Sequence, residues 1–542
     1  MDSHKNRLIR FGFILLSFAV LCLCSIHVLQ EKESLFLDEY SSFGCANGTV
    51  LGKEIPYESG VTYTQEEILK LTNDTYAVTP DMRFRFDNVW ANLANNVHPP
   101  VFYAALHFLC SLTPGVYGMW QPYVINIFFS IILLFFFQKF TKCLTDSVWL
   151  SGILCLLWSG TIGFTASVVF LRDYTAAMCA CLIAAWECCR YLKGNRRIPD
   201  LIKIAFASAF AVLCHYYCAI YIFFLCAVMC VLLMLHKNWK SIVQLIISEI
   251  GAAIFAVAVF PSLITCMFLS HRGTEATENL TELNASSFKT SLEYYFKSIN
   301  SHLFGNMFLY LVIIIVLLLL ASLILTKKHR LPRRDASQSK NLTPEDILLL
   351  IVPVLGYYVV VSKIAPYQTP RYMYPVYSVM YLSLISLITY ALQALAGKRV
   401  LAVCMSVVML SVSVLSWHNG NVLHLYRGMN RTIEDKLEPY RGIDAIQIWS
   451  SIHSLNCVTI PEYSYFDSVT FFYKSDRDEI LSFPAFSGSE DLMLLLAKTN
   501  KDDYVQLIQE AYPYYEVTEL GNVDKQGRFI NYYLHNTGES AE

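Results

Sequence analysis

Two adjacent carboxylates, Asp38 and Glu39, follow closely on an apolar N-terminal segment. Residues 11–29 form an almost unbroken apolar run, and a helix needs about 20 such residues to cross a bilayer. A carboxylate at the boundary between membrane and water can remove the proton from an acceptor hydroxyl. Acidic residues also end membrane helices on the outer side without any catalytic role. The position of the pair by itself therefore leaves both interpretations open.

A second set of ionisable and aromatic residues stands at the ends of later apolar runs. Each member has a structural alternative, such as a charge pair between helices, a headgroup contact or a helix start. Together they favour function, because ionisable groups near membrane depth are costly and tend to face a cavity. Arginine and lysine would bind a phosphate leaving group and stabilise its charge. The set comprises His98, Arg172, Asp173, Tyr174, His215, Tyr216, Lys363, Arg371 and Tyr372.

Composition places the chain among polytopic membrane proteins. Of its 542 residues 55% are hydrophobic and only 15% are charged. The formal net charge is −2 and there is no basic tract, so nucleic-acid binding is not expected. Most of the 17 cysteines lie inside apolar runs, where they behave as small apolar side chains. None has zinc-site spacing with histidines, so no cysteine metal site is predicted.

The distribution of lysine and arginine predicts how the chain crosses the membrane. Lys5, Arg7 and Arg10 place the N-terminus in the cytoplasm, ahead of an uncleaved anchor. Later basic clusters at 139–142, 190–197, 236–240, 327–334 and 398–399 then all fall on the cytoplasmic side, and the C-terminus lies outside. Eleven crossings are predicted, at 11–29, 119–138, 147–165, 175–191, twice within 200–235, and at 241–269, 304–326, 346–362, 372–393 and 400–416.

Three stretches are predicted to lie outside the bilayer core. Residues 98–112 are apolar but too short to cross, which indicates an interfacial or re-entrant helix at the outer surface. Residues 270–303 are predicted as an outer loop. Residues 418–542 are polar with short alternating runs, typical of a small soluble α/β domain. The expected organisation is a transmembrane domain at 1–417, with its first outer loop at 30–118, and an extracytoplasmic domain at 418–542.

The order of these motifs resembles that of a known superfamily. An acidic pair after the first helix, followed by His98-Pro99-Pro100 before an aromatic and aliphatic helix, resembles the GT-C membrane glycosyltransferases. The resemblance is narrower to the bacterial branch related to protein O-mannosyltransferases and lipid A aminoarabinose transferases. It extends over about residues 8–416. Its later elements are an Arg-x-Tyr motif, a His-Tyr turn and a late Arg-Tyr followed by proline, matched by Arg172-Asp173-Tyr174, His215-Tyr216, and Arg371-Tyr372 with Pro375.

The resemblance implies a fold, a reaction and residue roles. The fold would be a mainly α-helical polytopic membrane protein of about eleven transmembrane helices with the C-terminal α/β domain. A sugar would pass, with inversion, from a polyprenyl phosphate to an acceptor outside the membrane, which is a cell-envelope glycan, a lipid or a protein. Asp38 would be the general base and Glu39 would help to position a substrate. Lys363, Arg371 and Arg172 would bind the donor phosphate, and His98, Tyr174, His215, Tyr216 and Tyr372 would shape the pocket.

Two departures from the family pattern stand out. Many relatives carry an acid two residues before the arginine of Arg-x-Tyr, where this chain has Phe170, while Asp173 follows the arginine instead. Asp173 is kept as a catalytic candidate, and whether it takes over the role of that acid, pairs with Arg172 or does neither is open. The acids Asp38 and Glu39 are also adjacent, whereas metal-dependent oligosaccharyltransferases have an acid-x-acid signature. No cofactor is therefore assigned, and a divalent metal ion is left open.

Two other classes of protein fit parts of the pattern. A transporter or flippase of polyprenyl-linked sugars would carry its charged residues near the bilayer midplane, on broken helices in repeated halves. Here the charged residues cluster at the outer ends, and no repeated half is evident. A structural subunit of an envelope-assembly complex would tolerate loss of Asp38. The enzyme interpretation places the protein in a bacterial cytoplasmic membrane.

Overall fold

The computed structural model describes residues 4–48, 55–94, 96–194, 196–282, 284–327, 342–393, 395, 398–449, 453–487, 490–498 and 501–538. The chain forms two compact units, each assembled from segments that are far apart in sequence. Unit 1 contains Met1–Leu29, Leu93–Phe102 and Pro122–Leu423. Unit 2 contains Gln30–Asn92, Tyr103–Gln121 and His424–Glu542.

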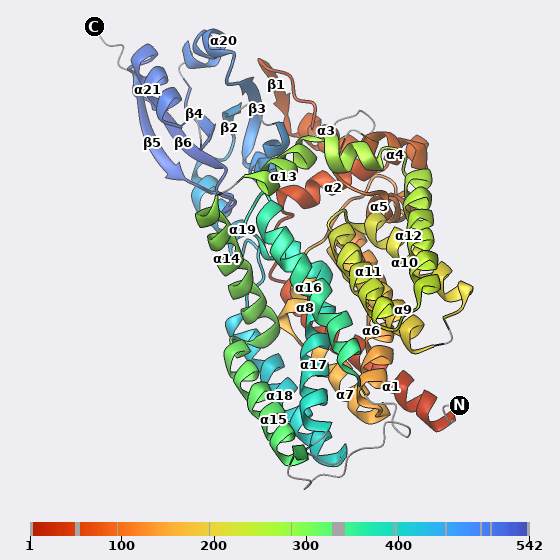
Figure 1. Cartoon of the computed structure of the whole chain (residues 1–542). Helices are drawn as coiled ribbons and strands as arrows, with labels where there is room; N and C mark the ends of the chain where they lie inside the picture. Colours follow the sequence, from red (N-terminus) through yellow and green to blue (C-terminus); the bar gives the residue numbers. More distant parts are fainter. Residues whose placement is uncertain are drawn as a thin grey trace. The chain divides into compact units, whose positions relative to one another are not determined.

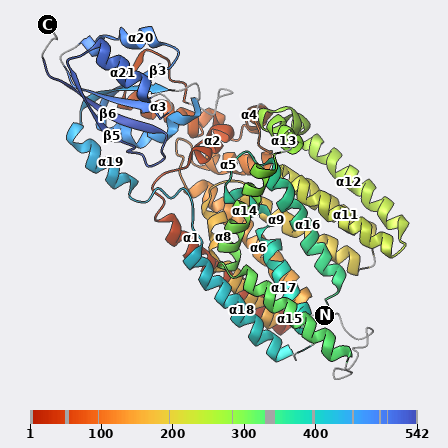
Figure 2. The ribbon, with the colours of Figure 1, turned by 60° about the vertical axis from the view of Figure 1, so that its left-hand side comes forward.

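Unit 1 is helical. α9 packs against α10, α10 against α12 and α11 against α16 (Figure 1), and α15 packs against α17 (Figure 2). Its helices are α1 (His4–Leu29), α6 (Trp120–Thr145), α7 (Val148–Ser159), α8 (Ile162–Val169), α9 (Tyr174–Lys193), α10 (Ile198–Cys214), α11 (Cys218–Leu235), α12 (Trp239–Val259), the π-helical turn η2 (Thr265–Leu269), α13 (His271–Thr281), α14 (Ala285–Phe304), α15 (Phe308–Lys327), α16 (Pro344–Ile364), η3 (Pro370–Val376), α17 (Tyr377–Gln393) and α18 (Lys398–Asn419).

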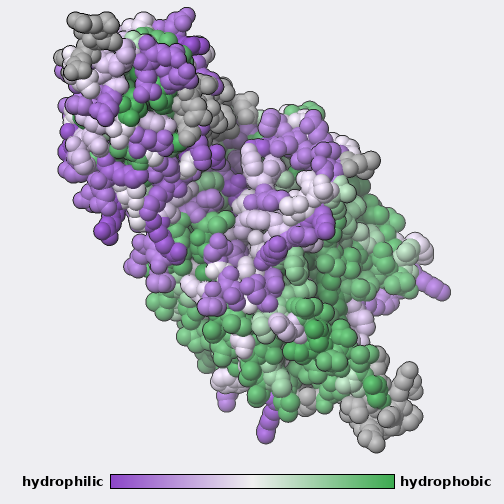
Figure 3. Space-filling view, turned by 90° about the vertical axis from the view of Figure 1, so that its left-hand side faces the viewer, coloured by the Kyte–Doolittle hydropathy of each residue, from purple (hydrophilic) through white to green (hydrophobic). Residues whose placement is uncertain are grey.

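These helices make the chain a multi-pass membrane protein. Within the described residues, eight helices are long and apolar enough to cross a bilayer, or ten if each of two bent pairs is one span. α10 has 17 residues, the lower end of the usual range for a span. Many large hydrophobic side chains of α15 and α18 are exposed, and the visible face of unit 1 is largely hydrophobic (Figure 3). Such a surface is typical of helices in contact with lipid. The bilayer core offers no hydrogen-bond partners, and a helix pairs its own backbone N–H and C=O groups.

Two predicted stretches of unit 1 differ in detail. The crossing predicted at 147–165 is a bent pair, α7 and α8, with an angle of 56° between them. Gly160 ends α7, and Thr161 caps α8 by accepting a hydrogen bond from Phe164 N. The stretch 270–303, predicted as an outer loop, holds two helices, α13 and α14. Ser270 and Asn284 cap these helices. Both helices are amphipathic, so their apolar residues form a narrow stripe and not the long apolar run by which the other helices were predicted.

Unit 2 is built on a six-stranded sheet with the order β1-β3-β2-β4-β6-β5. β2 runs parallel to β3 and β4, and the other neighbours are antiparallel. The strands are β1 (Val61–Thr64), β2 (Ile443–Trp449), β3 (Phe466–Tyr473), β4 (Leu492–Ala497), β5 (Tyr515–Gly521) and β6 (Phe529–Asn536). The C-terminal α/β region is thus confirmed, and its edge strand β1 comes from the first predicted outer loop.

The sheet of unit 2 is covered on both faces. One face carries an aliphatic core that includes Ile446, Leu494 and Ile530, packed with Tyr504 and Ile508 of α21 (Lys501–Ala511). The other face contains a buried polar network around Gln447 and Asn531. The remaining elements of the unit are α2 (Leu37–Asn47), α3 (Gln65–Tyr76), η1 (Pro80–Met82), α19 (Met429–Leu437), η4 (Glu438–Tyr440), η5 (His453–Tyr465), α20 (Arg477–Leu481) and η6 (Pro484–Ser487).

Two helices lie across the division between the units. α4 (Phe86–Ala94) and α5 (Pro100–Leu112) each contribute residues to both. α5 has 13 residues and is apolar, so the stretch predicted at 98–112 is helical and too short to span a bilayer.

Candidate functional site

The candidate residues form two groups, the acidic pair in unit 2 and a basic and aromatic cluster in unit 1. Asp38 and Glu39 lie in the first turn of α2. An acidic side chain in the first turn interacts favourably with the positive end of the helix dipole. Glu39 Oε2 also accepts a hydrogen bond from Phe36 N at 2.8 Å, which satisfies one of the backbone donors at the start of the helix.

Glu39 is engaged in a buried ion pair. Lys32 Nζ lies 2.9 Å from Glu39 Oε2, and the two side chains are 1% and 0% exposed. Lys32 Nζ also donates to the carbonyl of His424 at 3.0 Å. A buried carboxylate that is neutralised and hydrogen-bonded in this way has a structural role in the fold.

Asp38 is different, although it is the next residue. It is half-buried, and its carbonyl accepts a hydrogen bond from Ser42 Oγ at 2.9 Å. Of the two neighbouring carboxylates, Asp38 is the one that retains access to solvent, and therefore to a substrate. The structure thus distinguishes the two neighbours by burial and ion pairing, which the sequence did not show.

In unit 1 the cluster begins at the break between α8 and α9. Asn126 Nδ2 donates to the carbonyls of Val168 and Phe170 at 2.9 and 3.0 Å, and so fixes the last turn of α8. Arg172 follows this break and donates from Nη2 to His98 Nε2 at 3.1 Å. Because arginine is only a donor, this contact places the His98 proton on Nδ1.

Asp173 occupies the N-cap position of α9 but makes no side-chain capping hydrogen bond. It is 1% exposed, and neither carboxylate oxygen accepts a hydrogen bond from any residue that the structure describes. Its charge acts on His215 in the turn between α10 and α11. Burial lowers the pKa of His215, Asp173 opposes this effect, and Arg172 and Arg371 add to it.

Aromatic rings connect the three segments of this cluster. The Tyr174 ring lies 5.0 Å from the His215 ring. The Arg371 guanidinium lies 5.6 Å from the centre of the Phe170 ring and 5.3 Å from that of Tyr372. The Tyr372 carbonyl accepts a hydrogen bond from Tyr357 Oη at 2.6 Å, which fixes the start of η3. Arg172, Asp173, Tyr174, His98, His215, Arg371 and Tyr372 are therefore brought into one region of unit 1.

Two predicted members of the cluster have other contacts. Lys363 Nζ donates to the carbonyl of Glu282 at 2.6 Å and lies 5.8 Å from the centre of the Phe288 ring. The side chain of Tyr216 is half-buried next to Cys266 of η2.

Sequence reasoning missed Lys32, which reads as an ordinary flanking charge between Glu31 and Glu33. It also missed Asn126, whose role depends on the break in the facing helix.

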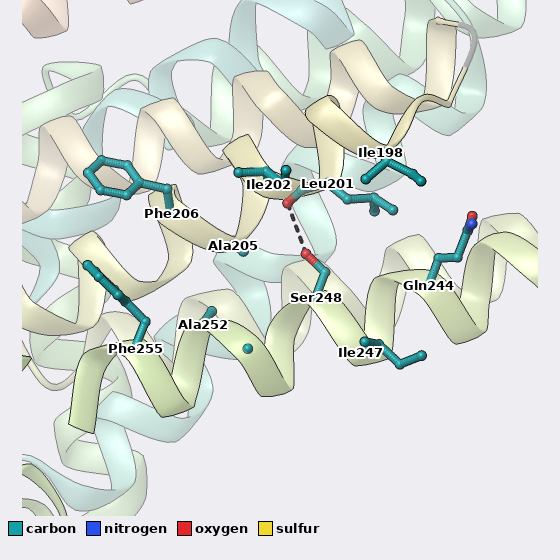
Figure 4. A pocket seen from close by; sticks show the side chains of 11 residues that line it. Ile198, Leu201, Ile202, Ala205, Phe206, Gln244, Ile247, Ser248, Ala252 and Phe255 are labelled. Carbon is teal, nitrogen blue, oxygen red and sulfur yellow. Dashed lines mark hydrogen bonds between the residues drawn. The ribbon is translucent and has the colours of Figure 1, made fainter. Parts of the chain in front are cut away.

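Unit 1 also has an apolar groove of about 480 Å³ between α10 and α12 (Figure 4). Ser248 Oγ donates a hydrogen bond to the carbonyl of Leu201 at 2.9 Å, and none of the side chains that line the groove is titratable. It suits an acyl or isoprenoid chain and no charged ligand. Its lining consists of Ile198, Leu201, Ile202, Ala205, Phe206, Gln244, Ile247, Ser248, Gly251, Ala252 and Phe255.

The parts of the chain that the structure describes hold no preformed metal site. There, no three or more His, Cys, Asp or Glu side chains are arranged to hold a metal ion.

Comparisons with known proteins find similarity among solved structures. No family model and no curated protein matches the chain. Among solved structures it is similar to ArnT from Cupriavidus metallidurans bound to undecaprenyl phosphate, with a TM-score of 0.47 and 12% sequence identity. The match covers 96% of this chain and 98% of that chain. At this level of similarity we base the function on the residues of this chain.

Proposed function

We propose that this membrane protein is a glycosyltransferase that moves a sugar from a polyprenyl phosphate to an acceptor outside a bacterial cytoplasmic membrane. The acceptor is a cell-envelope glycan, a lipid or a protein. The N-terminus would be cytoplasmic and the C-terminus outside. The observation that carries the proposal is the closeness of Arg371 to the segment of Arg172: the Arg371 guanidinium lies 5.6 Å from the centre of the Phe170 ring, two residues before Arg172. Two guanidinium groups at such a place suit an anionic lipid headgroup.

The arginines would bind the donor phosphate. A guanidinium offers parallel donors that match phosphate oxygens, and it stays charged when buried. Arg172 is oriented by His98, and Arg371 is supported by the rings of Phe170 and Tyr372. Lys363 would contribute to phosphate binding only after releasing the Glu282 carbonyl. Tyr174, His215 and Tyr216 would line the sugar pocket, and Asp173 would accept a hydrogen bond from a sugar hydroxyl.

Asp38 would act as the general base. Its carboxylate takes the proton of the acceptor hydroxyl while the acceptor oxygen attacks the anomeric carbon. The bond from that carbon to the phosphate oxygen breaks on the opposite face, so the configuration inverts. The polyprenyl phosphate leaves with its electron pair, and the arginines stabilise the developing charge. Glu39, held by Lys32, would keep the first turn of α2 in place.

A transfer assay on the purified protein tests this proposal, with a panel of polyprenyl-phosphate sugars and with and without a chelator. Asp38→Asn is expected to lower kcat by about 10²–10⁴-fold. Asp74→Asn, which changes an exposed carboxylate of the same unit, is the matched control. Arg172→Lys and Arg371→Lys should raise the KM for the donor. Full transfer by Asp38→Asn would remove the proposed base, and lipid movement across vesicles without sugar transfer would favour the flippase.

A further inference from the structure

A short segment at the start of the C-terminal region, residues 424–430, contacts the stretch that leads into the acidic pair. We call this segment the brace. Glu33 N donates to the Leu425 carbonyl at 2.9 Å, and Lys32 Nζ donates to the His424 carbonyl at 3.0 Å. The Phe36 ring stacks on the His424 ring, with centroids 3.8 Å apart and an angle of 18°. All these residues belong to unit 2.

The far end of the brace is attached as well. The Glu33 carboxylate accepts hydrogen bonds from Gly428 N at 2.5 Å and Asn430 N at 2.7 Å, so it caps the start of α19. Arg427 pairs with Glu31. Residues 31–33 and 36 therefore hold the brace by backbone, side-chain and ring contacts.

The brace has an unusual backbone. His424 has φ 60° and Tyr426 has φ 55°, and Gly428 follows with φ 69°. Residues with a Cβ rarely adopt this left-handed region, because it costs them free energy. Two such residues within three positions persist only where the surrounding contacts determine the conformation, and such sites often serve function.

The brace also lies within electrostatic reach of both acids. Burial raises the pKa of Tyr426, Glu39 and Asp524 raise it further, Arg528 lowers it, and Asp38 raises it. The charged groups that act on Tyr426 are thus Asp38 and Glu39 of α2 and Asp524 and Arg528 of the turn between β5 and β6, while Lys32 pairs with Glu39. The His424 ring lies on Phe36 directly before α2.

We infer that the brace is a positioning element for Asp38, acting through Lys32, Glu39 and Phe36 on the first turn of α2. This inference rests on the proposed function. His424 fixes Lys32 and Phe36, Lys32 fixes Glu39, and Glu39 fixes the backbone donor of Phe36 next to Asp38. The C-terminal region then takes part in the transfer step itself, and Lys32 and His424 are positioning residues.

The test uses the full-length protein and two variants. Lys32→Met/Glu39→Met removes both partners of the ion pair, a change that folded proteins often tolerate. His424→Ala keeps the backbone carbonyl but removes the stacked ring. Each is expected to lower kcat by about 10- to 100-fold, with the KM values of donor and acceptor within about twofold of wild type. Arg441→Gln, which removes an exposed ion pair elsewhere in unit 2, is the matched control and should leave kcat unchanged.

Hydrogen–deuterium exchange provides a second measurement that needs no substrate. Amides in the first turn of α2 should exchange faster in both variants, while those of α3 stay unchanged. Wild-type kcat in both folded variants would overturn the inference, whether or not exchange increases. Equal transfer by wild type and Asp38→Asn would instead overturn the proposed function. Unchanged exchange in α2 would show separately that the brace does not hold that helix.

Discussion

Glu39 in unit 2 and Asp173 in unit 1 are both buried carboxylates near the start of a helix, yet their surroundings differ completely. Glu39 contacts Lys32 Nζ at 2.9 Å and accepts a hydrogen bond from Phe36 N. Neither oxygen of Asp173 accepts a hydrogen bond from a described residue. A carboxylate whose partners come from the protein contributes to the fold. In the proposed function a sugar hydroxyl supplies the partner of Asp173, so the two carboxylates should respond oppositely to substitution.

The largest effect on the free energy of unfolding is expected at Glu39, whose carboxylate is paired with Lys32. Glu39→Gln leaves the Lys32 ammonium buried without its counter-charge, which costs about 3–5 kcal/mol of unfolding free energy. Denaturant unfolding in detergent would measure the loss. Lys32→Met/Glu39→Gln should recover most of it, because no unpaired charge then remains. A Glu39→Gln protein as stable as wild type would contradict the claim that Glu39, unlike Asp173, contributes to stability.

Two further buried carboxyl groups sharpen the comparison through pH. Glu462 and Asp524 are both 0% exposed, and Asn531 Nδ2 donates to Glu462 Oε2 at 2.5 Å. Burial raises the pKa of Asp524 to about 6 and, together with the Asp524 charge, raises the pKa of Glu462 well above its usual range. These two acids avoid the cost of a buried charge because they stay protonated.

The sign of the pH effect follows from the raised pKa values. Between about pH 4 and pH 6, and higher for Glu462, the folded state holds protons that the unfolded state has lost. The stability of unit 2 should therefore fall as pH rises through this window, by on the order of 2–3 kcal/mol. Glu462→Gln should flatten the dependence in thermal unfolding scans. Stability that rises with pH in wild type would contradict this assignment.

Asp173 should show the opposite behaviour to Glu39. Asp173→Asn removes a buried charge that accepts no hydrogen bond, so stability should be unchanged or increased by up to about 1–2 kcal/mol. Donor turnover should nevertheless fall, since the proposed acceptor of a sugar hydroxyl is weakened. Unfolding and transfer assays on the same preparation would test this pairing. A strongly destabilised Asp173→Asn protein would mean that the residue is structural after all.

The smallest effect is expected at the exposed edge of unit 2. Thr62 Oγ1 of β1 lies 2.7 Å from Thr470 Oγ1 of β3. Thr62→Val should cost no more than about 0.2–1 kcal/mol, since cross-strand pairs at a sheet edge contribute little. A loss as large as that of Glu39→Gln would show that attachment of the first loop, and not the buried ion pair, dominates the stability of unit 2.

The sequence predicted the features that depend on long apolar runs, because bilayer thickness fixes the length of a span. It did not reveal α14, whose apolar stripe of Tyr295, Ile299 and Leu303 is interrupted by polar residues. Nor did it reveal β1, since four residues are too short for a clear alternating pattern. Candidate residues could be selected by type and order, but their burial and their ion pairs could not be predicted. The difference between Asp38 and Glu39 depends on Lys32, which precedes the helix and follows no helical spacing.

The discontinuity of the unit 2 sheet has a consequence for biosynthesis. Thr62 and its partner Thr470 are separated by 408 positions along the chain. At about 5–20 residues per second, translation delivers β3 on the order of half a minute after β1. During that interval β1 has no neighbouring strand to pair with. Its residues are mostly exposed and polar, which disfavours aggregation of the unpaired segment in the nascent chain. A chain arrested before β3 should therefore leave its first loop open to proteases, and completion of the last quarter of the protein should close it.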